Sequence, residues 1–466
     1  MRKPPAGGFL FVCGREKHEE NNTSLIRRAI MIPSGLLFER MVRPVSTFFG
    51  PGILKGSVTA PASKSEAHRS MICAGLTRGV TRLENFTPSA DTRATARCLE
   101  ALGAHIEENG SVLTVDGAHH RKEMLPVFDC GESGSTLRFF VPLALILCGG
   151  GIFRMHGRLG QRPMDVYREL FVPRGVQWHM GEGADGAAEL MVAGQMKPGE
   201  YVLPGSVSSQ FVSGLLLALP LLSGSSRLRV LPPVESAGYI RMTLQALEQS
   251  GITIRREVEN VYEIPGAQHY QAMSGKLQGD WSQAAVLFCA GALGSDIRIQ
   301  GLSRNTTQGD AAILADLEQM GARVLEDDGI CVQGGNLHGV DLDMRDTPDI
   351  APMLALVCQM AEGESRLRGC GRLRLKECDR LAGTVDILNR LGGNAREDGD
   401  DMVIQGVASL KGGCRVDVRS DHRMVMLASI AATVCEQSVE VEDTDALNKS
   451  WPEYLRVFAD LGGRLS

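Results

Sequence analysis

A glycine that follows an amphipathic helical pattern and precedes an alternating strand pattern recurs six times in this 466-residue chain. The six glycines, 70 to 76 residues apart, are Gly103, Gly175, Gly251, Gly321, Gly392 and Gly462. Glycine often takes the left-handed conformation directly after a helix ends, so we expect each of these residues to terminate a helix. A period this regular indicates one structural unit repeated six times.

Each unit combines a hairpin with two kinds of helix. Alternating apolar and polar residues after most of these glycines predict hairpins over 104–115, 252–264, 322–332 and 394–404. Each unit also contains a nearly all-apolar segment, which is typical of a buried helix. These segments begin near Ser65, Ser135, Ser209, Trp281, Asp349 and Asp421.

The length of the unit decides between two architectures. Helical solenoid repeats have roughly 20–50 residues, so a longer unit favours globular domains. We expect two domains of three units each, with the apolar helices packed inside. Residues 63–277 form one domain, and residues 41–62 with 278–466 form the other. Residues 1–40 carry no repeat unit, and we expect a disordered extension or a start codon assigned too early, with Met41 as the functional beginning.

Composition excludes several classes of protein. With 49 basic and 55 acidic residues the net charge is −6, which argues against a nucleic-acid binder. No apolar run reaches the roughly 20 residues of a membrane span. The 12 cysteines include no Cys-x-x-Cys pair, so the sequence has no zinc-ligand framework. We therefore expect buried, reduced thiols in a cytoplasmic protein.

Basic residues gather where the helices are expected to start, although the chain is acidic. Capping explains the serines and aspartates there, such as Ser63, Ser133 and Asp421. Capping does not explain basic side chains, because positive charge opposes the helix macrodipole at this end. Four such residues are Lys64, Arg162, Lys376 and Lys449. A bound phosphate or carboxylate would reverse the effect, so we predict a cleft between the domains for a multiply anionic ligand.

These segments together resemble a known family. The matching pieces, in order, are Ser63-Lys64-Ser65 with Arg69, Gly134-Ser135 with Arg138, Arg162-Pro163, Gly205 to Phe211, Ser236 with Tyr239, Pro348-Asp349, Lys376 to Arg380, Asp421 to Met424 and Lys449 to Pro452. From about Met41 to Ser466 the chain closely resembles the 5-enolpyruvylshikimate-3-phosphate synthase family of enolpyruvyl transferases. The resemblance implies a two-domain inside-out α/β barrel, each domain built of three βαβαββ units with buried helices.

The resemblance also implies the reaction. The enolpyruvyl group of phosphoenolpyruvate is transferred to the 5-hydroxyl of shikimate 3-phosphate by addition and elimination, and phosphate is released. This step belongs to chorismate and aromatic amino acid biosynthesis. It requires no metal or organic cofactor. We expect a monomer whose partners are these two small molecules.

Roles carry over by position in the matching motifs. The implied shikimate 3-phosphate ligands are Lys64, Ser65, Arg69, Ser208, Ser209, Gln210, Ser236, Tyr239, Asp349 and Lys376. The implied phosphoenolpyruvate ligands are Lys64, Gly134, Arg162, Gln210, Arg380, Arg423 and Lys449. The reaction needs a general base and a general acid. Asp349 is expected at the hydroxyl and Glu377 at C3, with Lys64 assisting the departing phosphate. Lys376, Glu377 and Arg380 are expected to share the start of one helix.

Three positions depart from the common family pattern, and two alternatives stay open. Glu132 stands where many members have Asn, Arg372 where many have Asn or Glu, and Phe139 where Pro is frequent. The sister transferase that acts on UDP-N-acetylglucosamine shares the fold, but it typically has Lys-Asn where this chain has Lys64-Ser65, and it has a catalytic loop cysteine. A noncatalytic scaffold that only keeps the repeat would have no reason to retain so many polar segments at helix starts.

Overall fold

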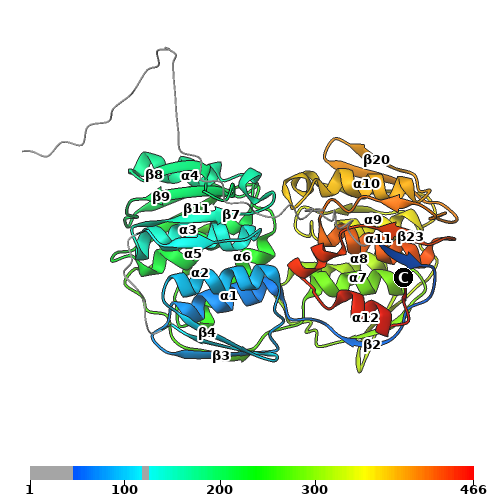
Figure 1. Ribbon diagram of the computed structural model, residues 1–466, viewed down its shortest axis with the longest axis horizontal. Coiled ribbons are helices and arrows are strands. Elements are labelled where there is room, and N and C mark those ends of the chain that lie inside the picture. Colours follow the sequence, from blue (N-terminus) through cyan, green and yellow to red (C-terminus); the bar gives the residue numbers. More distant parts are fainter. Residues whose placement is uncertain (1–45, 118–124) are drawn as a thin grey trace, which may run out of the picture. The chain divides into compact units, whose positions relative to one another are not determined.

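The computed structural model describes residues 46–117 and 125–466 (Figure 1). The expectations about residues 1–40 and Met41 lie outside these ranges. None of the helices in the described ranges is long and apolar enough to cross a membrane.

The six repeat units correspond to six four-stranded sheets with one common topology. In each sheet three strands are antiparallel and one edge strand is parallel to its neighbour. Three sheets belong to the middle of the chain: β14 (Ser274–Lys276), β3 (Val80–Glu84), β5 (Val112–Asp116) and β4 (His105–Asn109); β6 (Val127–Asp129), β7 (Gly150–Met155), β9 (Ala188–Ala193) and β8 (Gln177–Glu182); β10 (Glu200–Pro204), β11 (Ser226–Leu231), β13 (Val261–Ile264) and β12 (Arg255–Val258).

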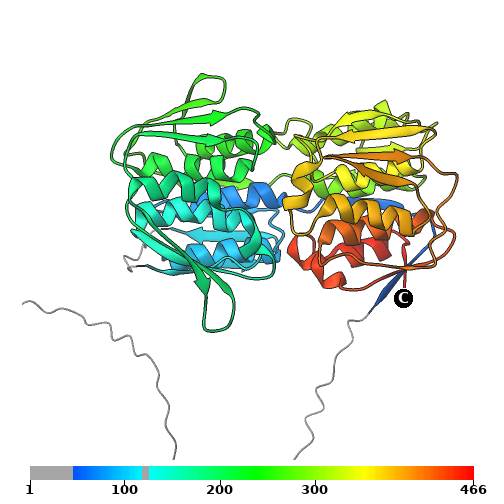
Figure 2. The same cartoon turned by 90° about the horizontal axis from the view of Figure 1, so that it is seen from above.

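The other three sheets are formed by the later part of the chain, and two of them also include a strand from the beginning of the described residues. They are β2 (Lys55–Thr59), β15 (Asp296–Gln300), β17 (Gly329–Gln333) and β16 (Arg323–Asp327); β18 (Asp341–Asp343), β19 (Glu364–Arg368), β21 (Asp401–Gln405) and β20 (Ala395–Asp398); β22 (Arg415–Val416), β23 (Val439–Val441), β1 (Thr47–Gly50) and β24 (Arg464–Leu465). The blue strand β1 therefore lies beside the C-terminal residues (Figure 2). All four predicted hairpins are confirmed as β4–β5, β12–β13, β16–β17 and β20–β21.

Each sheet is accompanied by a buried and an amphipathic helix. The buried helices are α1 (Lys64–Gly75), α3 (Gly134–Leu147), α5 (Ser209–Ala218), α7 (Trp281–Ala292), α9 (Ala351–Gln359) and α11 (His422–Val434). The amphipathic helices are α2 (Ala90–Ala101), α4 (Asp165–Phe171), α6 (Ala237–Gln249), α8 (Ile313–Gln319), α10 (Arg380–Arg390) and α12 (Tyr454–Asp460). The six repeat glycines all have positive φ, between 75° and 101°, so the predicted left-handed helix ends are confirmed.

The buried side chains form two cores. One contains apolar residues between Ala62 and Leu277, and the other contains Phe49, Leu54, Ala60 and residues from Trp281 to Leu461. We name the elements around the first core, α1 to β14, the first lobe, and the remaining elements the second lobe. The helices lie inside each lobe and the sheets outside (Figures 1 and 2), which confirms the expected α/β class with buried helices.

The two segments that join the lobes run side by side. Ala62 pairs with Gly279 in an isolated antiparallel bridge. The bridge is flanked by a hydrogen bond from Ser63 N to Gln278 O and one from Asp280 N to Pro61 O, each 2.8 Å. These joins place the first residues of α1 and α7 next to each other: Lys64 N donates to the Asp280 carboxylate at 3.0 Å.

Candidate active site

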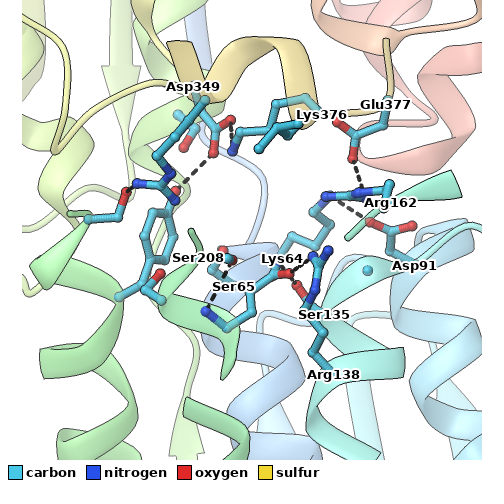
Figure 3. Close-up of a pocket in the computed structure, with 18 of the residues that line it drawn as sticks. Lys64, Ser65, Asp91, Ser135, Arg138, Arg162, Ser208, Asp349, Lys376 and Glu377 are labelled. Carbon is cyan, nitrogen blue, oxygen red and sulfur yellow. Dashed lines mark hydrogen bonds and ion pairs between the residues drawn. The ribbon is translucent and has the colours of Figure 1, made fainter. Parts of the chain in front are cut away.

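Residues of both lobes line one pocket in the part of the chain that the structure describes. Of the site residues expected from the sequence, all but Lys449 contribute to its wall: Lys64, Ser65, Arg69, Gly134, Arg162, Ser208, Ser209, Gln210, Ser236, Tyr239, Asp349, Lys376, Glu377, Arg380 and Arg423. Figure 3 shows Asp349, Lys376 and Glu377 facing the group formed by Lys64, Ser65, Ser135 and Arg138. Residues more than 300 positions apart in sequence are thus brought together.

The first lobe contributes the beginnings of its helices. The three predicted caps are confirmed, because Ser63, Ser133 and, in the second lobe, Asp421 each accept a hydrogen bond from a backbone N–H in the first turn. Gly134 opens α3 directly beneath two guanidinium groups. A Cβ added there would lie 2.7 Å from Arg162 Nη1 and 3.1 Å from Arg138 Nη1, so only glycine lets both approach.

The positions of the cations relative to the helices correct one expectation. Lys64 is the first residue of α1, but Arg162, Lys376 and Lys449 lie at the ends of the 3₁₀ turns η1 (Leu159–Gln161), η5 (Gly371–Leu375) and η6 (Thr444–Lys449). Lys376 and Glu377 therefore precede α10 and do not share its first turn with Arg380. The physical reason is that the Asp379 side chain accepts from Ala382 N and starts the helix there.

Arg380 is the centre of the second lobe's contribution. Its side chain is 2% exposed and donates to three carboxylates: Asp421 at 2.8 and 3.2 Å, Asp349 at 2.9 Å and Glu377 at 2.6 Å. Burial alone would lower the pKa of Arg380, but these charges outweigh it and raise the pKa well above its ordinary value. Arg380 stays charged and holds all three carboxylates in place.

Asp349 joins the two lobes through its two oxygens. Oδ1 accepts from Lys376 Nζ and Arg380 Nη1, each at 2.9 Å, and Oδ2 accepts from Tyr239 Oη at 3.1 Å. Burial would raise the pKa of Asp349, yet the charges of Lys376, Arg380 and Arg423 hold it well below its usual range. The carboxylate is therefore ionised at neutral pH and able to accept a hydrogen bond from a ligand hydroxyl.

Glu377 is bound from both sides by arginine. Arg380 Nη2 lies 2.6 Å from Oε2. Arg162 Nη1, from the first lobe, lies 3.5 Å from Oε1 (Figure 3). Burial raises the pKa of Glu377, but the charges of Arg380, Arg162 and Lys449 reverse the shift and lower it well below its ordinary value. Glu377 is therefore an anion among these cations.

Lys449 lies outside the pocket wall. Its ammonium group is 2.9 Å from Oε2 of Glu132, which immediately precedes the cap of α3. Burial would lower the pKa of Lys449, whereas Glu377, Asp91 and Glu132 raise it above the usual value. Lys449 is therefore a cation that interacts electrostatically with Glu377, although it does not itself line the pocket.

Sequence reasoning missed several groups in the pocket. Asp91, in the first turn of α2, lies 2.7 Å from Lys64 Nζ. Arg138, which belongs to the motif that begins at Gly134, donates to Gln210 Oε1 at 2.5 Å and lies over the Phe211 ring. Burial, aided by the charge of Arg162, lowers the pKa of Arg138 to about 9. The Ser-x-x-Thr capping pattern that begins at Ser89 could have placed Asp91 in the first turn of a helix. The pairing of Asp91 with Lys64, however, depends on the packing of α1 against α2.

Three arginines of the pocket each have one nitrogen atom without a hydrogen-bond partner among the described residues. The Nε atoms of Arg138, Arg162 and Arg423 are buried and have no hydrogen-bond acceptor among the described residues. Unpaired buried donors are costly, so an anion that reached them would be stabilised. Within residues 46–117 and 125–466, no three His, Cys, Asp or Glu side chains come together in a way that could hold a metal ion.

The sequence of the chain is similar to those of one known family. A family described as EPSP synthase (3-phosphoshikimate 1-carboxyvinyltransferase) matches residues 49–458. A 3-phosphoshikimate 1-carboxyvinyltransferase of Clostridium perfringens is 41% identical over 418 residues, covering 89% of this chain and 98% of the relative. One of Clostridium botulinum is 39% identical over 420 residues, with 89% and 96% covered.

Solved structures agree on the fold. An EPSP synthase of Acinetobacter baumannii superposes with a TM-score of 0.75 at 24% identity, covering 90% of this chain and 99% of that one. The enolpyruvyl transferase NikO of Streptomyces tendae has a TM-score of 0.74 at 19% identity, with 91% and 98% covered.

Proposed function

The chain belongs to the EPSP synthase family, and we propose on that premise that it transfers the enolpyruvyl group of phosphoenolpyruvate to the 5-hydroxyl of shikimate 3-phosphate. It is thus an enolpyruvyl transferase of the shikimate pathway. The observation that carries the proposal is the pocket itself, in which Lys64, Arg162 and Arg423 lie with two carboxylates, Asp349 and Glu377. The three cations can bind two anionic substrates, and the two carboxylates can serve as proton acceptor and proton donor.

Shikimate 3-phosphate occupies the side of the pocket nearest the first lobe. We assign its binding to Lys64, Ser65, Arg69, Ser208, Ser209, Gln210, Ser236, Tyr239, Asp349 and Lys376. Two features support this assignment. Serine hydroxyls and backbone N–H groups gather at the starts of α5 and α6, where anions are stabilised. Asp349 faces them from the second lobe and holds Tyr239.

Phosphoenolpyruvate occupies the region between the arginines. We assign its binding to Lys64, Gly134, Arg162, Gln210, Arg380, Arg423 and Lys449. The buried, partnerless Nε atoms of Arg162 and Arg423 support this assignment, because phosphate and carboxylate oxygens would supply the missing acceptors. Gly134 supports it too, since its lack of a side chain opens the α3 start to the ligand.

The first half of the reaction needs a proton acceptor at the 5-hydroxyl. We assign this role to Asp349, which is ionised and already accepts one hydroxyl hydrogen bond, from Tyr239. As the hydroxyl oxygen bonds to C2 of phosphoenolpyruvate, its proton moves to Asp349. Lys376 donates a hydrogen bond to the same carboxylate. It stabilises the negative charge that passes from Asp349 to the hydroxyl oxygen as the proton moves.

The second centre needs a proton donor at C3, and we assign this role to Glu377. Without a ligand Glu377 is an anion because Arg380, Arg162 and Lys449 surround it. The negative charge of bound phosphoenolpyruvate offsets the positive charge of these three cations. This raises the pKa of Glu377, which can then take up a proton. Donation to C3 makes a methyl group on the tetrahedral adduct. Glu377 then recovers a proton from that methyl group as the C2–O bond to phosphate breaks, and Lys64 stabilises the departing phosphate.

A phosphate-release assay tests the proposal. Release should require both phosphoenolpyruvate and shikimate 3-phosphate, and UDP-N-acetylglucosamine should not replace the latter. The alternative acceptor is disfavoured because no cysteine lines the pocket among the described residues. Release with phosphoenolpyruvate and UDP-N-acetylglucosamine, but not with phosphoenolpyruvate and shikimate 3-phosphate, would assign the chain to the sister transferase.

We also propose the organisation that the repeat suggested, a monomer with domain boundaries near residues 62 and 278. The two separate cores support these boundaries. Light scattering should give the mass of one chain. A cytoplasmic location is part of the proposal. It is supported by the free cysteines, of which nine of the eleven in the described ranges are buried.

A further inference from the structure

Arg372 reaches from the second lobe to the segment that precedes α6 in the first. Its Nη1 atom donates to Ser236 Oγ at 2.8 Å and lies 3.4 Å from Oε2 of Glu235. The side chains of Arg372 and Glu235 are only 13% and 16% exposed. Arg372 lines the pocket, whereas Glu235 does not. The guanidinium is thus held between a carboxylate behind it and the pocket in front.

Ser236 has an unusual place in this contact. It is the N-cap of α6, but its φ of 55° is left-handed and its side chain makes no capping hydrogen bond. Its hydroxyl accepts from Arg372 instead, and the structure gives the hydroxyl proton no acceptor among the described residues. A buried serine that is strained and does not cap its helix has a donor free for a ligand.

Arg372 adds positive charge near two other cations of the pocket, Lys376 and Arg138. Burial lowers the pKa of Lys376, and the charges of Arg380 and Arg372 lower it further. Arg372 likewise contributes, after burial and Arg162, to the lowered pKa of Arg138. Glu235 is the carboxylate that contacts Arg372, and it does so at 3.4 Å. An anion with several oxygens would relieve this repulsion and match the paired donors of the guanidinium.

We propose that Arg372 binds the phosphate group of shikimate 3-phosphate beside Ser236, and that Glu235 is the residue that positions its guanidinium. This inference rests on the proposed function, because it assumes that shikimate 3-phosphate is the ligand. The competing explanation is that Arg372 only ties the lobes together through Glu235 and Ser236. A tie would support any ligand of the pocket equally, whereas a phosphate contact would distinguish ligands with and without phosphate.

Calorimetric binding of shikimate 3-phosphate and of shikimate separates the two explanations. In Arg372→Gln we expect affinity for shikimate 3-phosphate to fall about 10- to 100-fold, the usual effect of losing a hydrogen bond to a charged group. Affinity for shikimate should stay within about twofold. Arg372→Lys should lose less, because it keeps the charge without the planar fork. Glu235→Gln should weaken only the phosphorylated ligand, by a few-fold.

The matched control is Arg368→Gln, four residues earlier. Arg368 is half exposed, pairs with Asp341 and does not line the pocket, so both affinities should be unchanged. Thermal unfolding shows whether each variant is folded, and Arg372→Lys carries the test if Arg372→Gln is not. Equal weakening of both ligands by Arg372→Gln, or no weakening of either, would overturn this inference alone. A wild-type protein that does not bind shikimate 3-phosphate would overturn the proposed function as well.

Discussion

Lys449 Nζ lies 2.9 Å from Oε2 of Glu132, a contact between residues 317 positions apart and on different lobes. The Glu132 side chain is half exposed and packs over Gly157, where an added Cβ would lie 2.6 Å from the Glu132 Cδ. Lys449 is one of the cations that we assign to phosphoenolpyruvate. The ligand must therefore compete with a carboxylate of the protein for this ammonium group.

Replacing Glu132 by Gln should improve phosphoenolpyruvate binding. The change removes a competing negative charge that is partly solvated, an effect of at most about 1 kcal/mol. We expect the KM for phosphoenolpyruvate to fall by roughly two- to fivefold while kcat changes less than about twofold. Steady-state kinetics with Glu182→Gln, an exposed glutamate on β8, as control would check this. A higher KM in Glu132→Gln would mean that the ion pair instead holds Lys449 in its binding position.

Glu377→Gln should lose catalysis and keep its fold. Glutamine preserves the shape of the side chain but cannot carry the proton to and from C3. Arg380 keeps its contacts with Asp421 and Asp349, so the network survives. We expect kcat to fall roughly 10²- to 10⁴-fold with little change in thermal stability. Near-normal turnover would remove Glu377 from the mechanism and leave Asp349 and Lys64 as the proton carriers.

Asp421→Asn should cost stability far more than the matched change at Asp417. Each aspartate accepts a backbone N–H two residues ahead at 2.8 Å, from Arg423 and Arg419 respectively, and asparagine can do the same. Asp421 is also fully buried against Arg380, whereas Asp417 is exposed. Breaking a buried pair costs about 3–5 kcal/mol. Urea unfolding should show a loss near this size for Asp421→Asn and less than about 0.5 kcal/mol for Asp417→Asn; equal losses would contradict the role of Arg380.

His68 should make the protein less stable in mild acid. It is buried in α1 and its Nδ1 atom lies 2.7 Å from Thr95 Oγ1. Burial lowers its pKa from 6.5 to about 3. Because the unfolded chain takes up the proton first, the stability that this group contributes is complete above pH 6.5 and is lost as pH falls toward 3.

The test compares wild type with His68→Gln at pH 7 and pH 5. Titration through 1.5 pH units at 1.36 kcal/mol each makes the acid-induced loss about 2 kcal/mol larger in wild type. Urea unfolding at both pH values measures this difference. His422, which burial also shifts below its ordinary pKa, remains in both proteins and cancels in the comparison. Identical losses in the two proteins would show that His68 is already protonated in the folded state.

Local signals in the sequence were enough for much of the fold. The glycines at helix ends, the hairpins and the all-apolar helices depend on residues close in the chain, and the structure confirms them. The position of Lys376 could not be predicted in this way. A helix start and a 3₁₀ turn have similar local patterns, and Asp379, not Lys376, begins α10.

The electrostatic network was the least predictable part of the site. Arg380 holds Asp349, Glu377 and Asp421 together. This arrangement depends on three segments of the chain that pack around one buried side chain. The pairing of Lys64 with Asp91 depends in the same way on how α1 packs against α2. Sequence spacing brings residues to a helix end, but which charges neutralise each other is decided by tertiary packing.

The reaction proposed for this pocket is an addition at C2 and C3 of phosphoenolpyruvate followed by an elimination, in which C3 is transiently a methyl group. Turnover in D₂O with shikimate 3-phosphate, followed by mass spectrometry of the product, tests it most directly. We expect wild type to form phosphate together with product that carries deuterium at its methylene carbon, and we expect much less of both from Glu377→Gln. Phosphate release with no deuterium in the product would contradict it.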